Sequence, residues 1–126
     1  MRRLKTLGCM LALVVASISL AQGQEAAERF VPIGQSPGQS GKTTTIGTVQ
    51  AVDAQARGIT VAVDGNAIHL TWTERTRIWL DRSRQQLGAL KGSDSDIQVG
   101  RRIEVKPDKG DSSRADWIKV DPTTTP

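Results

Sequence analysis

The side chains best suited to ligand chemistry lie in one polar stretch just beyond the middle of the chain. Five cations and two tryptophans fall within 20 residues, opposed there only by Glu74 and Asp81. Cations and aromatic rings are the side chains with which small β-domains bind anionic or extended ligands. The candidate binding residues are Trp72, Arg75, Arg77, Trp79, Arg82, Arg84 and Lys91.

The same residues also fit a structural role. Tryptophans bury a large surface and stabilise small cores. Arginines along a strand keep its edge solvated and discourage pairing with other chains. The composition alone leaves both interpretations open.

Residues for catalysis are scarce. A nucleophile needs a neighbouring base, and His69 is the only histidine. No Gly-x-Ser-x-Gly turn occurs, and Asp94 and Asp96 fall in a polar loop typical of solvated turns. We therefore expect a protein that is not an enzyme and needs no cofactor.

His69 is the one candidate metal ligand. Beyond Cys9 the chain has no cysteine, so a transition-metal site would need carboxylates as the other ligands. Its strand position favours an ordinary polar residue on an outer face, and metal binding through His69 is kept as an alternative.

The first 21 residues have the pattern of a secretory signal peptide. Residues 2–5 carry three positive charges, residues 7–20 are uncharged and mostly apolar, and Ser19 and Ala21 suit cleavage after Ala21. The apolar run is shorter than the roughly 20 residues of a bilayer span. We expect a periplasmic or secreted protein with no membrane span after cleavage near Ala21.

Removal of the signal would change the charge balance. The chain has 17 basic residues, and loss of the three near its start leaves 14 against 13 acidic ones. A nearly neutral domain does not have the overall positive charge typical of nucleic-acid binding. We expect an envelope protein, a glycan or another anionic ligand as partner, and no nucleic acid.

Composition divides the remaining chain into three parts. Residues 22–43 are rich in Gln, Gly, Ser and Pro, which predicts a flexible leader. Residues 44–121 contain the alternating apolar pattern of a folded domain, and residues 122–126 form a tail.

Short apolar runs separated by turn residues predict an all-β domain. Gly47 indicates a sharp bend or bulge, where a Cβ atom would crowd the neighbouring backbone. One helical turn is expected over residues 95–100. The expected strands are residues 44–52, 59–63, 67–72, 76–80 (a strand or an extension of the one before), 101–106 and 114–120.

This pattern predicts a small five-stranded OB-like antiparallel barrel with one short helical turn. The order of the runs around Gly47–Asp53, Gly58–Val61, Thr76–Ile78 and Asp96–Val105 resembles small exported bacterial OB-like domains of unknown function. It is also similar to the periplasmic copper- and silver-binding OB barrels, which implies a metal role. That family uses methionine sulfur, whereas Met1 and Met10 both lie in the signal.

The function these observations favour is a non-enzymatic exported binding or accessory module that presents a basic, tryptophan-containing surface to an anionic partner. Two alternatives stay open. One is a periplasmic metal-handling protein, and the other is a structural envelope-stress protein without a discrete ligand.

Overall fold

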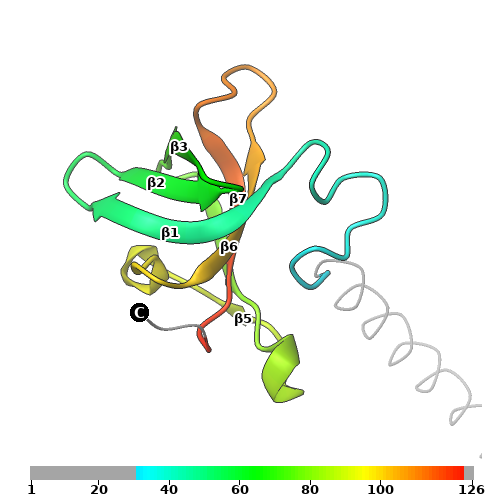
Figure 1. Ribbon diagram of the computed structural model, residues 1–126. Helices are drawn as coiled ribbons and strands as arrows, with labels where there is room; N and C mark the ends of the chain where they lie inside the picture. The colour runs from blue at the N-terminus through cyan, green and yellow to red at the C-terminus, as the bar shows by residue number, and fades with distance from the viewer. Residues whose placement is uncertain (1–30, 124–126) are drawn as a thin grey trace, which may run out of the picture. The chain divides into compact units, whose positions relative to one another are not determined.

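Seven strands form one sheet in the computed structural model, which describes residues 31–123 (Figure 1). The expected signal peptide, residues 22–30 of the leader and residues 124–126 of the tail lie outside the described residues. No helix within residues 31–123 is both long and apolar enough to cross a membrane. The strands are β1 (Thr45–Asp53), β2 (Gly58–Val63), β3 (Asn66–Thr71), β4 (Arg77–Leu80), β5 (Leu90–Lys91), β6 (Arg102–Pro107) and β7 (Ala115–Val120).

The all-β prediction is confirmed, but the predicted count of five strands is wrong. The sheet is open, with the order β3-β2-β1-β6-β7-β4-β5, and β4 pairs with β7 in parallel. The segment after β3 leaves β2 and joins β7 instead, so β4 is a strand of its own. The extra strand β5 lies between the expected strands 76–80 and 101–106, where no strand was predicted.

The single helical turn predicted over residues 95–100 is replaced by two shorter turns. Two 3₁₀ turns occur in the described residues, η2 (Ser83–Gln85) and η3 (Asp94–Asp96). Ile97, which was expected inside the turn, is instead extended and buried in the core. Burial of this apolar side chain ends the turn earlier than the glycine at position 100 suggested.

Strand β1 curls so that it pairs with two different neighbours. Its first half pairs with β6 and its second half with β2, and the register shifts between Val49 and Ala51. Gly47 lies where these strands approach most closely, because a Cβ there would lie 2.8 Å from the Val61 side chain and closer still to the Ala62 carbonyl oxygen. The prediction of a crowded backbone at Gly47 is confirmed, while the bulge itself lies at Gln50.

The inward faces of the strands build the core. Alternate residues in β2, β6 and β7 point into it, as the pattern predicts. Of the three tryptophans only Trp72 is a core residue, whereas Trp79 and Trp117 are half-buried. The core consists of Val49, Ile59, Val61, Leu70, Trp72, Ile78, Ile97, Ile103, Val105, Ala115, Ile118 and Val120.

Residues 32–44, which we call the strap, pack onto the domain where a flexible leader was expected. Backbone hydrogen bonds close successive turns within the strap, for example from Ser40 N to Ser36 O at 3.0 Å. Gly34, Gly38 and Gly41 all have positive φ, which glycine adopts without strain. The glycine-rich composition therefore supports tight turns, and Ile33 anchors the strap as a buried apolar side chain.

The strap covers Glu104, which points away from the core but is completely buried. The Glu104 carboxylate accepts hydrogen bonds from Gly34 N at 3.0 Å, from Ser40 Oγ at 2.7 Å and from Thr44 Oγ1 at 2.8 Å. A buried carboxylate is tolerated only where donors replace its lost water. Glu104 lies between the inward-facing Ile103 and Val105, and the strap is what removes it from solvent.

Two further charged side chains are buried beside the strap. Lys119 lies opposite Glu104 in the β6–β7 ladder and is 6% exposed. Burial lowers the pKa of Lys119 below its ordinary value, and the carboxylates of Glu104 and Asp81 oppose that shift. Asp81 accepts a hydrogen bond from Ile33 N at 2.8 Å, so the strap contacts both acids through its backbone.

Replacing Glu104 by Ala should destabilise the domain by about 3 kcal/mol, since it leaves the strap donors without their acceptor and removes one of the two negative charges that oppose the effect of burial on Lys119. Urea unfolding measures this, and the protection of the Gly34 amide against hydrogen exchange should fall in parallel. The exposed Glu74→Ala variant is the control and should change stability by less than about 1 kcal/mol. Equal stabilities for the two variants would contradict the role of the buried carboxylate.

Replacing Gly47 by Ala should cost about 2 kcal/mol in urea unfolding, because the new methyl group has no room beside β2. Gly58→Ala is a matched control in the same sheet, since no atom lies within 4 Å of a Cβ built there. A Gly47→Ala protein as stable as Gly58→Ala would show that the curl of β1 does not need a glycine.

Candidate functional site

Four of the seven predicted binding residues line one cleft. The cleft has a volume of about 730 Å³, and residues 73–79 and 91–95 line it. Arg75, Arg77, Trp79 and Lys91 are among them, and we call this cleft the groove. Two segments that are distant in sequence thus bring cations and an indole ring together.

The groove is held by a turn on one side. Thr73 N donates to Thr76 Oγ1 at 2.9 Å, and Thr76 N donates to Thr73 O at 3.1 Å. Thr76 Oγ1 also donates to Ala115 O at 2.7 Å, which ties the turn to β7. These bonds fix residues 73–76 and leave the Glu74 and Arg75 side chains exposed.

The other side of the groove is held by β5 and η3. Ser93 N donates to the Asp96 carboxylate at 2.8 Å and so caps the 3₁₀ turn. Gly92 lies against Ile78, where a Cβ would be only 2.9 Å from the Ile78 side chain. Lys91 pairs with Trp79 across the β4–β5 ladder, which places the lysine beside the indole.

The cations of the groove differ in their availability. Arg77 forms an ion pair with Asp116 at 3.4 Å. Arg75 and Lys91 are exposed, and within residues 31–123 their side chains form no ion pair and no hydrogen bond. Charged groups without partners are the ones that bind a ligand without first breaking an existing contact.

The two acids that line the groove belong to a separate network. Arg57 Nη2 lies 3.6 Å from the Glu74 carboxylate, and Arg57 Nε lies 4.0 Å from that of Asp94. Arg57 therefore balances much of the negative charge near Arg75, and no sequence pattern pointed to it, because 17 residues or more separate it from both acids.

Three of the predicted binding residues lie elsewhere. Trp72 is 2% exposed in the core, so its side chain cannot contact a ligand at the surface. Arg82 Nε donates to Gly88 O at 2.7 Å within its own loop, and Arg84 Nη1 lies 3.4 Å from the Asp121 carboxylate. Neither arginine lines the groove, since the chain turns at η2 after β4 and carries both away from it.

His69 lies on the exposed face of β3, as predicted. Its Nδ1 is 2.9 Å from Thr60 Oγ1 on the neighbouring strand. Among residues 31–123 no three or more His, Cys, Asp or Glu side chains come together as a metal site would require.

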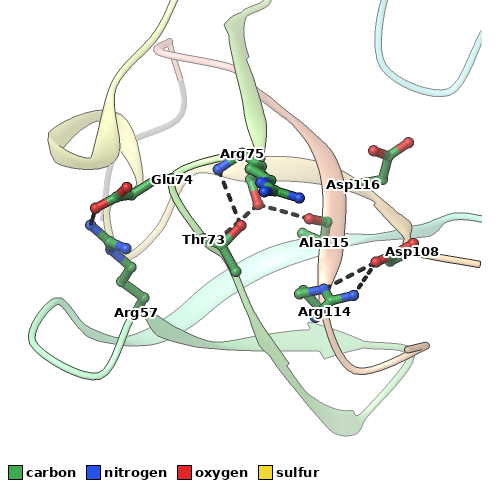
Figure 2. A pocket seen from close by; sticks show the side chains of 9 residues that line it. Arg57, Thr73, Glu74, Arg75, Asp108, Arg114, Ala115 and Asp116 are labelled. Atoms are coloured by element: carbon green, nitrogen blue, oxygen red, sulfur yellow. Dashed lines mark hydrogen bonds and ion pairs between the residues drawn. The ribbon is translucent and has the colours of Figure 1, made fainter. Parts of the chain in front are cut away.

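A second cleft of about 540 Å³ shares residues 73–76 with the groove (Figure 2). Its far wall comes from β7 and the β6–β7 turn, where Arg114 binds Asp108 through both Nε and Nη2. The Arg114 guanidinium holds the pKa of Asp108 below its usual range. Figure 2 shows Arg75 between this pair and the Arg57–Glu74 pair.

Comparisons with known proteins do not assign a family. No protein-family model matches the chain, and no curated protein matches it either. Among solved structures, the crystal structure of Ag(I)CusF aligns with a TM-score of 0.41 and 17% sequence identity, over 61% of this chain and 93% of that one. A likeness of this extent does not indicate what this chain binds.

The Arg84–Asp121 pair should make stability depend on pH. Burial opposes ionisation of Asp121, but hydrogen bonds from Thr123 and Arg84 outweigh it and lower the pKa of Asp121 below the ordinary 3.8. A lowered pKa adds stability that is complete above 3.8 and is lost as the pH falls through the lower value of the folded state. Asp121→Asn should therefore be less stable than the parent at pH 6, and the gap should close in strong acid. Urea midpoints across this range measure it, and a constant gap would contradict the assignment.

Proposed function

We propose that this chain is an exported, non-enzymatic binding module whose groove receives an anionic partner through Arg75, Lys91 and Trp79. The observation that carries the proposal is the pair of exposed cations without partners beside a half-buried indole in one cleft. Export rests on the signal pattern of the first 21 residues.

The groove suits binding better than it suits catalysis. The carboxylates in its lining, Glu74 and Asp94, face Arg57 at 3.6 and 4.0 Å, and no histidine lines it. What these side chains supply is charge, an aromatic surface and a fixed turn.

The fold supports the same proposal. If β3 and β4 are treated as two parts of one interrupted strand, the pairings follow those of an OB-like barrel, in which the third strand contacts both the second and the last. The interruption is the segment 72–76, whose last four residues form a wall of the groove. OB-like barrels use the face around this strand to bind extended ligands.

The experiment is a binding titration with three probes of equal charge: trigalacturonate, triglutamate and a thymidine oligonucleotide with three phosphates. Trp fluorescence of the purified chain reports contact with Trp79, and Trp79→Phe assigns the signal. Binding of a probe should weaken at least tenfold in the Arg75→Ala/Lys91→Ala variant, since each charge-assisted hydrogen bond contributes about 1.5–3 kcal/mol.

The matched control is Lys42→Ala/Lys109→Ala, which removes the same charge from exposed positions outside both clefts. It should bind like the parent. Failure of all three probes to bind, or equal loss in the two double variants, would overturn the proposal.

A further inference from the structure

We infer that the ligand of the groove is a linear, sparsely charged acidic oligosaccharide that crosses the turn 73–76 at Arg75 and continues into the second cleft. This inference rests on the proposed function and adds to it the class of ligand and its path. The path follows from the wall that the two clefts share, and the class follows from the charges and ring in their linings.

The shared wall indicates an elongated ligand. Both clefts are lined by the same four residues, 73–76, and together they extend from β5 on one side to the β6–β7 turn on the other. Glu74 and Arg75 are exposed at this wall, so nothing in residues 31–123 covers the crossing point. Arg75 lines both clefts, and a ligand centred on it has room to continue in either direction.

The second cleft offers further cationic contacts. Arg114 uses Nε and Nη2 for Asp108, and Arg57 uses Nε and Nη2 for its two acids. A guanidinium carries five N–H donors in a planar fork, so each arginine keeps donors for one more oxygen. Both side chains are about 40% exposed, which leaves them accessible from the cleft.

The acids in the walls exclude a densely charged ligand. Glu74 and Asp94 line the groove, and Glu74, Asp108 and Asp116 line the second cleft. A chain with a charge at every unit, such as a nucleic acid, would bring phosphates close to these carboxylates, and like charges at short range repel. A ligand with one carboxylate among several hydroxyl groups fits a lining of alternating cations and anions. Its carboxylate can bind the cations, and its hydroxyl groups can donate hydrogen bonds to the acidic side chains.

The strand edges argue against a peptide that extends the sheet. The sheet edge beside the groove is β5, which has only two residues, Leu90 and Lys91. An added peptide strand takes its affinity from a row of main-chain hydrogen bonds, and two residues offer almost none. The half-buried Trp79 indole instead offers the flat apolar surface on which a sugar ring stacks.

The test is the dependence of affinity on chain length. Oligosaccharides of alternating glucuronate and N-acetylglucosamine, with two, four, six and eight sugar units, are titrated at constant 0.15 M salt, beside glutamate peptides and thymidine oligonucleotides of equal charge number. The affinity for these oligosaccharides should rise at least tenfold from two to six units, as the longer oligomers reach the second cleft, and should exceed that of both other series.

The variant that separates the clefts is Asp108→Ser/Arg114→Ser. It removes the ion pair whole, so the net charge is unchanged, and Gly110 N, which donates to Asp108 at 3.3 Å, is exposed and can bind water instead. It should bind the dimer like the parent and lose the gain with length. The control is Lys42→Ser/Asp64→Asn, two exposed positions away from both clefts, which should keep the gain.

The outcomes separate the two proposals. Two results would contradict a ligand that crosses from the groove into the second cleft. One is binding of short probes that needs Arg75 and Lys91 but does not strengthen with chain length, and the other is a gain with length that persists in Asp108→Ser/Arg114→Ser. In both cases the proposed function of the groove would still hold. Tighter binding of glutamate peptides or oligonucleotides overturns the sugar class. Absence of binding by every series overturns both proposals.

Discussion

The buried carboxylate of Glu104 is the contact on which the arrangement of the strap and the outer face of the sheet depends. Its three hydrogen bonds come from residues 34, 40 and 44, which lie 60 to 70 positions earlier in the chain. A buried carboxyl group needs such hydrogen-bond partners, and the cost of leaving it without them is large. The strap is therefore as much a part of the folded domain as the strands, although it consists of turns and contains no helix or strand.

The curl of β1 connects the strands beside the strap to the rest of the sheet. Because β1 pairs with β6 at its start and with β2 at its end, it brings the β1–β2–β3 strands over the β6–β7 pair (Figure 1). Thr71 N then donates to Ser113 O at 2.8 Å, and the chain continues from this point into the turn 73–76. The turn that carries Arg75 is thus positioned from both its ends, by β3 on one side and β4 on the other.

Ion pairing sorts the cations of the surface into two groups. Among the cations that line the two clefts, Arg57, Arg77 and Arg114 each lie beside a carboxylate, whereas Arg75 and Lys91 lie beside none within residues 31–123. Exposed pairs contribute little to stability, but they hold guanidinium groups in fixed directions and lower the local charge. The two clefts therefore have linings of alternating sign in which Arg75 and Lys91 are available, and this pattern is what the proposed acidic glycan matches.

The alternation of apolar residues was sufficient to predict the all-β class, the inward faces of the strands and the crowded position of Gly47. The period of two is a local property. Gly47 is crowded by the distant strand β2, but it could still be recognised because a glycine inside a strand marks a close approach of another backbone. The separation of β4 from β3 could not be read in this way, because it depends on β7, which lies about 40 residues later.

The residues of the candidate site likewise include some that could be predicted from the sequence and others that could not. Arg75, Arg77, Trp79 and Lys91 were found from composition, because they cluster in sequence as well as in space. The same sequence cluster contains Trp72, Arg82 and Arg84. Trp72 is nevertheless buried in the core, and the two arginines lie at the η2 turn, outside the groove. Arg57 and the fixed strap gave no signal, since their partners are distant along the chain, and Arg114 was not predicted although its partner Asp108 lies only six residues away. The sequence by itself thus determined the residue types and the strand pattern. The tertiary structure decided which charges are paired, which are buried and which remain available, because these depend on contacts between segments that are distant in the chain.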